Sequence, residues 1–455
     1  MTQDVTLPLW AFVLILLFAG VTFASHFLFP SVRWFFRRRM ERAVKKLNER
    51  LERPIQPFKL LRRQDMIQRL VYDPEVTQAI VEHAQSEGVR EDVAFERARR
   101  YAREIVPSFS AWAYFGFAIR AAKFLSTSLY RVRMVHHDST LSDVDPEATV
   151  VFVMNHRSNM DYVLVTYLAA DRSALSYAVG EWARVWPLSR LIRAMGAYFI
   201  RRKSRDELYR KVLARYVQQS TSAGVTQAVF PEGGLSLDGA LAHPKVGILK
   251  YILEGSRAAN RDVVFVPIAL NYDRVLEDTI LIAAQEAGTR RFRARISVVF
   301  AAILRQLWLR ITRRFHRFGY AAVSFGQPVL LSEVPNGATS PERVSAVIMD
   351  RIAQAVPVLP VPLVAYLLLH NGPLSRESLQ ATFDETLHKL GQSQVHVPRN
   401  DVAYALDFGL RTLIERGIAQ ESGGLVSIAQ DKTALARFYA NSIAHLMQDR
   451  AADAK

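Results

Sequence analysis

No cysteine occurs in the 455 residues of the chain. This absence excludes disulfide bonds, thiolate nucleophiles and metal sites that depend on cysteine. The eleven histidines form no H-E-x-x-H pattern, so the sequence predicts neither a zinc site nor another cofactor. Internal repeats and low-complexity tracts are also missing. Any chemistry must therefore come from other side chains.

Charge is missing from the N-terminal segment, where no charged residue lies between Asp4 and Arg33. The almost wholly apolar stretch 7–29 is long enough to span roughly 30 Å of hydrocarbon as a helix. Basic residues follow it: Arg33, Arg37, Arg38, Arg39, Arg42, Lys45 and Lys46. Because basic residues flank the cytoplasmic end of a span, we expect a single-pass protein of the inner (plasma) membrane with its bulk in the cytoplasm. A cleaved signal peptide would carry its positive charge earlier; a buried core helix is the alternative.

Acidic residues are few relative to basic ones: 43 Asp and Glu stand against 59 Lys and Arg, a formal net charge of +16. A basic protein is suited to nucleic acid, anionic lipid or anionic small substrates. Residues 31–53 and 290–317 are typical of basic helices that bind anionic membrane lipids, although an ordinary surface helix is the alternative for 290–317. From Asn371 onward the charges nearly balance, which argues against nucleic-acid binding.

Short β-branched runs alternate with helical stretches from Thr149 onward. This alternation predicts an α/β fold in which helices flank one sheet. The predicted strands are 149–154, 197–200, 227–230, 263–270 and 321–325, and the predicted helices include 162–170, 205–221 and 246–258. The apolar stretch 356–370 is short and contains three prolines, so it is a poor second span.

Four parts are therefore predicted along the chain. They are a transmembrane helix (1–30), a basic juxtamembrane and helical region (31–110), an α/β catalytic domain (111–335) and a helical C-terminal region (336–455). The last part is expected to be winged-helix-like, because two helical stretches precede a hairpin near 417–428.

A histidine and an aspartate follow the first of these strands, in Asn155-His156-Arg157-Ser158-Asn159-Met160-Asp161. The end of a strand that opens into a helix is where α/β folds place reactive groups. Here His156 can titrate near neutral pH, and Asp161 can reach its imidazole if the residues between them form a turn. Such a pair can act as a general base on a substrate hydroxyl, like a triad without its serine. A purely structural hydrogen bond is the alternative.

Three further blocks carry glycines or basic residues at element ends. Glu232 and Gly233 lie in Phe230-Pro231-Glu232-Gly233-Gly234-Leu235-Ser236, where paired glycines let the backbone approach a ligand, or simply form a tight turn. Arg201 and Arg202 follow the strand 197–200 and are able to clamp a phosphate, as is Lys245 at a helix start. A solvated basic surface is the alternative for the arginines.

In this order and spacing, the four blocks resemble those of the glycerolphosphate acyltransferase family. His156 and Asp161 are similar to its H-x4-D block, and Glu232-Gly233 to its glutamate–glycine block. The Ile-Arg-Arg block ending at Arg202 and the Pro-Lys-x-Gly step at Lys245 are also similar, as is the strand at Val266-Pro267-Ile268. The resemblance covers residues 110–330, about half of the chain, and favours the branch that acts on glycerol 3-phosphate.

The resemblance implies the family's α/β fold and transfer of a fatty acyl group to glycerol 3-phosphate at sn-1, in phospholipid biosynthesis. The donor would be acyl-CoA or acyl carrier protein. His156 would act as the base and Asp161 would orient it. Arg201, Arg202 and Lys245 would hold the phosphate, while Glu232 and Gly233 would shape the acceptor pocket. No metal is implied.

One block departs from the pattern of the related glycerol 3-phosphate enzymes. They usually follow Glu-Gly-Gly with Arg-Ser-Arg, whereas this chain has Leu235, Ser236 and Leu237. A phosphate-binding arginine is therefore missing, and acylation of 1-acylglycerol 3-phosphate (lysophosphatidate) stays open as the alternative. A non-catalytic membrane scaffold is the alternative from another class, and it requires the histidine–aspartate pair to be incidental.

Overall fold

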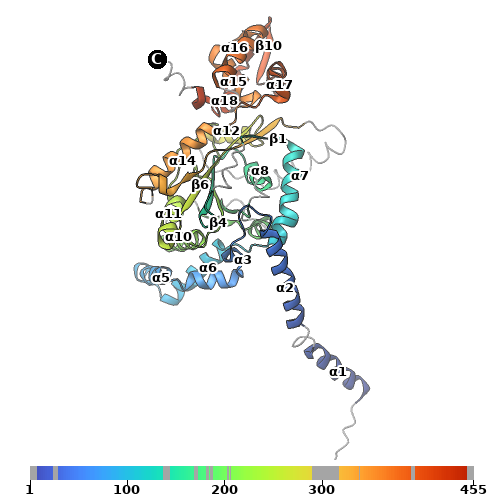
Figure 1. Cartoon of the computed structure of the whole chain (residues 1–455), viewed down its shortest axis with the longest axis vertical. Coiled ribbons are helices and arrows are strands. Elements are labelled where there is room, and N and C mark those ends of the chain that lie inside the picture. The colour runs from blue at the N-terminus through green and yellow to red at the C-terminus, as the bar shows by residue number, and fades with distance from the viewer. Residues whose placement is uncertain are drawn as a thin grey trace, which may run out of the picture. The chain divides into compact units, whose positions relative to one another are not determined.

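A computed structural model of the chain is drawn in Figure 1. It describes residues 8–23, 29–136, 144–168, 173–180, 184, 188–201, 204, 206–288, 317–337, 339–390 and 395–447. Contacts divide the chain into two compact units, Met1–Pro54 and Ile55–Lys455. Arg202 and the predicted basic helix at 290–317, apart from Arg317, lie outside the described residues.

The first unit contains two helices, α1 (Leu9–Phe23) and α2 (Phe29–Asn48). The large apolar side chains of α1, among them Leu9 and Phe18, are exposed. α1 has 15 residues, fewer than the roughly 20 that a membrane-spanning helix needs. Across all the residues that the structure describes, no helix combines the length and the apolar character required to cross a membrane. Of the segment predicted to span the membrane, residues 8–23 and 29–30 are described, and α1 lies within the first of these ranges.

The second unit is built around an eight-stranded sheet in the order β1-β7-β6-β2-β5-β3-β4, with β8 paired to β6. Its strands are β1 (Arg131–His136), β2 (Thr149–Met154), β3 (Ser176–Gly180), β4 (Tyr198–Ile200), β5 (Gln227–Val229), β6 (Val263–Tyr272), β7 (Tyr320–Phe325) and β8 (Val329–Leu330). The five strands from β6 to β4 run parallel, and β7 pairs antiparallel with β6. The carboxyl ends of β2, β5, β3 and β4 therefore meet at one edge of the sheet.

Runs of β-branched and aromatic residues account for the central strands. β2 reads TVVFVM and β6 reads VVFVPIALNY, and every residue of both strands is buried. Parallel strands covered on both faces are nearly continuous hydrophobic runs, and these two follow that pattern apart from Thr149 and Asn271. Directly after β2, the Asn155 side chain donates to the carbonyl of Leu270 at 3.0 Å and accepts from its N–H at 2.8 Å. This amide holds the end of β2 against β6.

Helices surround the sheet (Figure 1). α10 and α11 pack against each other, α7 packs against α8, and α14 packs against β6. Aspartates cap two of the helices around the sheet. Asp73 accepts from the N–H of Glu75 and Asp206 from that of Tyr209, which satisfies amides that a helix start leaves unpaired. The helices of the second unit that precede its C-terminal part are α3 (Pro57–Leu60), α4 (Arg63–Val71), α5 (Pro74–Glu87), α6 (Glu91–Ile105), the π-helix η2 (Trp112–Ala118), α7 (Ile119–Leu129), α8 (Met160–Leu168), α9 (Leu188–Ala194), α10 (Glu207–Ser222), α11 (Gly247–Ala259), α12 (Asp278–Glu286) and α14 (Pro341–Ala355).

The C-terminal part of the second unit is mostly helical. It contains α15 (Pro360–Asn371), α16 (Arg376–Leu390), α17 (Val402–Glu415) and α18 (Thr433–Ala440), with a small sheet of β9 (Leu374–Ser375), β10 (Ala419–Ser422) and β11 (Leu425–Ile428). Asn271, in β6, donates to the carbonyl of Pro357 at 2.9 Å. Asp273 accepts from the N–H of Val361 at 3.0 Å. These buried contacts join the end of β6 to the start of α15.

The predicted α/β class is confirmed, and the five predicted strands correspond to β2, β4, β5, β6 and β7. β1, β3 and β8 were not predicted; β3 reads SYAVG, with a single β-branched residue. The stretch 356–370, judged a poor second span, forms α15, most of whose side chains are buried within the protein. The hairpin expected near 417–428 is β10–β11.

Candidate active site

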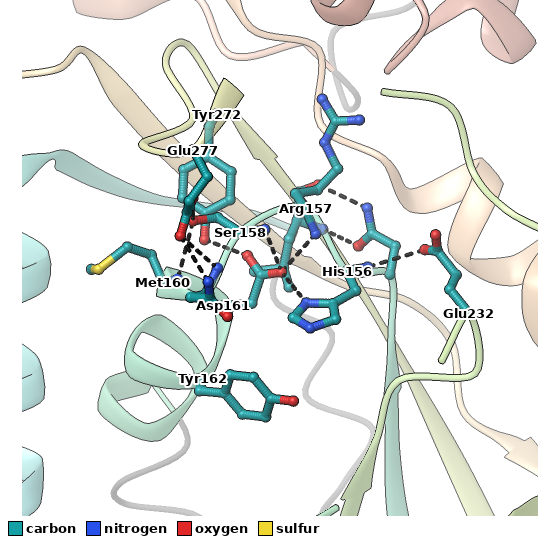
Figure 2. A network of polar contacts seen from close by, with 12 residues as sticks. His156, Arg157, Ser158, Met160, Asp161, Tyr162, Glu232, Tyr272 and Glu277 are labelled. Carbon is teal, nitrogen blue, oxygen red and sulfur yellow. Dashed lines mark hydrogen bonds and ion pairs between the residues drawn. The ribbon is translucent and has the colours of Figure 1, made fainter. Parts of the chain in front are cut away.

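His156 lies in the short turn that follows β2, and Asp161 lies in the first turn of α8, as Figure 2 shows. Nδ1 of His156 is 2.9 Å from Oδ2 of Asp161, and the two residues are only 1% and 0% exposed. This contact directs Nδ1 to the carboxylate and leaves Nε2 as the ring nitrogen that can meet a substrate. The turn that the sequence prediction required is present.

The Asp161 carboxylate also organises the turn itself. Its Oδ2 accepts hydrogen bonds from the backbone N–H groups of Arg157 at 2.7 Å and Ser158 at 3.0 Å. Because Asp161 lies in the first turn of α8, the positive end of the helix dipole favours its charge. One carboxylate therefore shapes the loop and orients the imidazole.

A tyrosine at the end of β6 binds the other oxygen of the Asp161 carboxylate, Oδ1. The hydroxyl of Tyr272 donates to Oδ1 of Asp161 at 2.7 Å, and burial, followed by the charge of Asp161, raises the pKa of Tyr272. The phenol thus stays protonated and remains a donor.

Glu277 binds two side chains of the turn: it accepts from the Ser158 hydroxyl at 2.8 Å and from Nδ2 of Asn159 at 3.1 Å. Burial raises the pKa of Glu277.

The segment that follows β5 forms the opposite side of the site. The backbone N–H of His156 donates to Oε1 of Glu232 at 3.0 Å, and that of Ala242 donates to Oε2 at 3.2 Å. Burial raises the pKa of Glu232 to about 7, although these two amide donors oppose the shift. The ring of Phe230 stacks on the imidazole with 4.1 Å between centroids. Glu232 therefore fixes the backbone of His156.

Gly233 and Lys245 belong to the same loop cluster as Glu232. Gly233 has φ +67°, and a Cβ added to it would lie 2.7 Å from Cδ of Lys245. Glycine is thus required both by the backbone conformation and by the close passage of the lysine side chain. The backbone N–H of Lys245 donates to the carbonyl of Pro231 at 2.7 Å, and the residue is exposed. The fold gathers the predicted Glu232, Gly233 and Lys245 beside the turn of His156.

Arg201 follows β4, which β5 and β3 separate from β2. Its guanidinium forms a two-point ion pair with Glu104, with Nε–Oε1 and Nη2–Oε2 distances of 2.8 and 2.7 Å. Arg201 thus shares the sheet edge of His156 but is bound to a carboxylate that the sequence analysis did not single out. Arg202, also predicted to hold the phosphate, lies outside the described residues.

The Arg157 side chain extends away from the imidazole (Figure 2). Its Nη1 donates to the carbonyl of Gly239, and its guanidinium carbon lies 5.2 Å from the centroid of the Phe438 ring in α18. Burial lowers the pKa of Arg157, and Nε and Nη2 have no hydrogen-bond partner within the described parts of the chain. The turn that follows His156 therefore packs against the C-terminal part.

Three residues of this arrangement escaped the sequence analysis: Tyr272, Glu277 and Glu104. Tyr272 bonds to a residue 111 positions away, and Glu104 to one 97 positions away. The only available hint was that Tyr272 ends the strand with the Val-Pro-Ile pattern.

The arrangement can take a proton from a hydroxyl group that approaches Nε2 of His156, with Asp161 stabilising the imidazolium. The nearby Ser158 hydroxyl donates to Glu277 instead of His156, so it is not set up as a nucleophile. In the described ranges, no group of three or more His, Asp or Glu side chains is arranged to hold a metal ion.

Comparison with known proteins adds two family matches. Residues 134–271 match the family described as acyltransferase, and residues 305–454 match the family described as glycerol-3-phosphate acyltransferase C-terminal region. The first match contains the His156 turn and the Glu232 loop, and the second contains α15 to α18.

Similar sequences carry the same description. A glycerol-3-phosphate acyltransferase of Shewanella loihica is 28% identical over 424 residues, and one of Shewanella amazonensis is 29% identical over 427. These alignments cover 85% and 84% of this chain and 50% of each relative, so the chain spans about half the length of the curated relatives it matches. A crystal structure of a 1-acyl-sn-glycerophosphate acyltransferase from Thermotoga maritima aligns with a TM-score of 0.33 and 17% identity, over 56% of this chain and 79% of that one.

Proposed function

We propose that the chain is a member of the glycerol-3-phosphate acyltransferase family and that it transfers a fatty acyl group from a thioester to the sn-1 hydroxyl of glycerol 3-phosphate. The observation that carries this proposal is the contact between Nδ1 of His156 and Asp161 at 2.9 Å. The carboxylate holds the imidazole by one nitrogen and leaves the other for the acceptor hydroxyl.

In the proposed reaction, Nε2 of His156 accepts the proton of the acceptor hydroxyl as its oxygen attacks the thioester carbonyl carbon. The C–S bond of the resulting tetrahedral intermediate then breaks. The departing thiolate takes the proton from the imidazolium, which regenerates the neutral base. Asp161 stays ionised throughout and stabilises the imidazolium, as the carboxylate of a triad does. No acyl group is attached to the protein.

The hydrogen bonds around Asp161 support this role. Two backbone amides and the hydroxyl of Tyr272 donate to the carboxylate besides the imidazole. Donors of this kind satisfy the acceptor sites of the carboxylate oxygens. They also hold it still, so that the imidazole is oriented before the substrates bind.

Acceptor phosphate recognition is proposed for Arg201, Arg202 and Lys245. Lys245 lies in the loop cluster of Glu232, and Arg201 lies at the same carboxyl edge of the parallel strands. Glu232 and Gly233 are proposed to shape the acceptor pocket, because Glu232 fixes the backbone of His156.

Lysophosphatidate is the second candidate acceptor. Leu235 and Leu237 follow the glycines of this loop and pack against the hydrophobic core as partly buried side chains. An apolar surface at this position suits a second lipid chain better than a phosphate.

We also propose that residues 1–30 anchor the protein in the inner membrane, with the second unit in the cytoplasm. The exposed apolar side chains of α1 support membrane insertion. The basic residues of α2 support an interaction with anionic lipids and the expected orientation. A reporter fused after Lys455 should be active in the cytoplasm, and a periplasmic signal would contradict this orientation.

The test of the activity is an acyl-transfer assay with the purified chain in detergent. Glycerol 3-phosphate and lysophosphatidate are each offered with acyl-CoA and with acyl carrier protein, and the products are separated by chromatography. Lysophosphatidate formed from glycerol 3-phosphate is the expected product. Phosphatidate formed only from added lysophosphatidate would assign the second candidate, and no product with any pair would reject the enzyme proposal.

A further inference from the structure

Glu104 lies in α6, outside every motif of the sequence, and binds two arginines from the carboxyl edge of the sheet. It accepts two hydrogen bonds from Arg201, at 2.8 and 2.7 Å, and one from Nη1 of Arg184 at 2.7 Å. Arg184 follows β3 and Arg201 follows β4, which are paired and parallel. One carboxylate thus gathers cations from two neighbouring strand ends.

The guanidinium of Arg201 is held from more than one side. Its central carbon lies 5.0 Å from the ring centroid of Tyr101 and 5.2 Å from that of Tyr209. The hydroxyl of Tyr209 also accepts a hydrogen bond from the backbone N–H of Arg201 at 2.9 Å. An arginine fixed in this way loses little side-chain entropy when it binds a ligand.

Exposure shows which part of this cluster can reach a ligand. The side chains of Arg184 and Arg201 are 34% and 32% exposed, whereas that of Glu104 is 5% exposed. The carboxylate thus lies behind the two guanidinium groups. Two positive charges against one negative charge leave the cluster cationic, and each guanidinium keeps N–H groups that Glu104 does not use.

A third arginine adds to the positive charge. Arg193, in α9, has a pKa lowered by burial and by the charge of Arg184, while Glu104 opposes the shift. Its Nε is buried and has no hydrogen-bond partner among the described residues. The three arginines therefore carry more positive charge than Glu104 balances, and Nε of Arg193 is a donor available for a further hydrogen bond.

We propose that Glu104 is a positioning residue that holds Arg184 and Arg201 as a paired receptor for the phosphate monoester of the acceptor. This inference rests on the proposed function. β4 lies three strand spacings from β2, or roughly 14 Å. Because the reacting hydroxyl of glycerol 3-phosphate lies only a glycerol backbone away from its phosphate, the two arginine side chains must extend from their strand ends toward His156 to hold the phosphate there.

A neutral side chain at position 104 would remove the attraction that overcomes the repulsion between the two guanidinium groups. The arginines would then separate, and the phosphate would lose a preformed two-point contact. A purely structural ion pair makes a different prediction. Its loss would lower stability without a specific effect on the acceptor.

The decisive variant is Glu104→Gln, because glutamine keeps the shape of glutamate and removes its charge. A matched control is Asp73→Asn. Asp73 forms a two-point ion pair with Arg215, at 2.9 and 2.8 Å, and its side chain is 7% exposed. This pair joins α5 to α10 and has no part in the proposed site. The measurements are the KM of acceptor and donor, kcat, the melting temperature, and binding of inorganic phosphate by calorimetry.

For Glu104→Gln we expect an acceptor KM about 10- to 100-fold higher, as for loss of charge-assisted contacts. Donor KM should stay within about twofold, and phosphate binding should weaken in parallel with the acceptor KM. Asp73→Asn should lower the melting temperature without changing either KM. Glu104→Asp should recover part of the phosphate affinity.

The outcomes separate this inference from the proposed function. Transfer activity with an unchanged acceptor KM in Glu104→Gln would overturn the role of Glu104 and leave the proposed function standing. A lower acceptor KM would also overturn it, because Glu104 would then compete with the phosphate. If the parent transfers no acyl group, the proposed function fails, and calorimetry decides on Glu104. Equal phosphate affinity in parent and variant, or no phosphate binding by the parent, would reject the site.

Discussion

Nδ1 of His156 lies 2.9 Å from Oδ2 of Asp161, and the same oxygen accepts hydrogen bonds from two backbone amides of the intervening turn. Four residues separate His156 from Asp161. A loop of this length lets one carboxylate bind the imidazole and two backbone amides of the loop at the same time. Losing the carboxylate would disturb both the charge beside the imidazole and the shape of the loop, so the two residues should behave as one unit.

Replacement of His156 by alanine should lower kcat by about 100- to 10,000-fold, because it removes the proposed base. Donor and acceptor binding should persist, since the side chain acts mainly in the transition state. Steady-state transfer measures the effect, and circular dichroism checks the fold. His445→Ala is the control, because His445 contacts the carbonyl of Ala353. A folded His156→Ala protein within a few-fold of parental turnover would end the proposed mechanism.

Replacement of Asp161 by asparagine should also lower kcat strongly, because the amide keeps the shape and removes the charge that stabilises the imidazolium. The double variant with His156→Ala should be little worse than the worse single variant. The measurement is a double-mutant cycle in kcat. Independent, multiplying losses would show that the two side chains do not act as a unit.

Removal of the Tyr272 hydroxyl by Tyr272→Phe should lower kcat by roughly tenfold, since a hydrogen bond to a charged group contributes about 1.5–3 kcal/mol. Tyr130→Phe is a matched control. Tyr130 is also buried, packs 5.3 Å from the Tyr272 ring, and donates to the carbonyl of Arg274. Both variants should lose similar stability in thermal unfolding. If they lose equal activity, Tyr272 does not act through Asp161.

Replacement of Lys245 by alanine should raise the acceptor KM by about 10- to 100-fold and leave the donor KM nearly unchanged, because one charge-assisted phosphate contact is lost. Lys250→Ala is the control, since Lys250 is an exposed lysine of the following helix, 4.0 Å from Glu254. Initial rates at varied acceptor concentration measure the effect. An equal rise for both variants would indicate only a general loss of positive charge.

Stability should fall as pH rises from about 5 to 7. Burial raises the pKa of Glu232 and of Asp273 to about 7, from ordinary values of 4.5 and 3.8. Between those values the folded protein holds more protons than the unfolded one, so the free energy of unfolding decreases with pH. The combined loss is on the order of a few kcal/mol. Asp273→Asn should flatten this dependence in melting curves, and stability that increases over this range would contradict the assignment.

Truncation of Phe438 to alanine should lower activity as well as stability, because its ring covers the guanidinium of Arg157 beside the catalytic turn. The cavity should cost about 3–5 kcal/mol. Phe383→Ala is the control, since Phe383 is equally buried in α16. Comparing the two variants at temperatures equally far below their melting points isolates the effect on kcat. Equal kcat values would restrict the C-terminal part to a stabilising role.

Local residue patterns are enough to locate the strands on which the site is built. Runs of β-branched residues identify β2 and β6, because strands buried on both faces are mostly apolar, and the short apolar run 228–230 identifies β5. Polar residues and glycines begin where these runs stop, and this change in residue type is enough to assign His156, Asp161 and Glu232 to strand ends. The spacing of His156 and Asp161 is local, so a turn could be predicted from it.

Which distant residues meet at those strand ends depends on how the strands and helices pack in three dimensions. The order of the strands brings Tyr272 to Asp161, and the packing of α6 brings Glu104 to Arg201, across 111 and 97 positions of the chain. Periodicity cannot predict such contacts, because they depend on which strands pair and which helix covers them. The sequence predicts that Arg201 binds phosphate but does not reveal its partner, whereas the packing of α6 places it in an ion pair with Glu104.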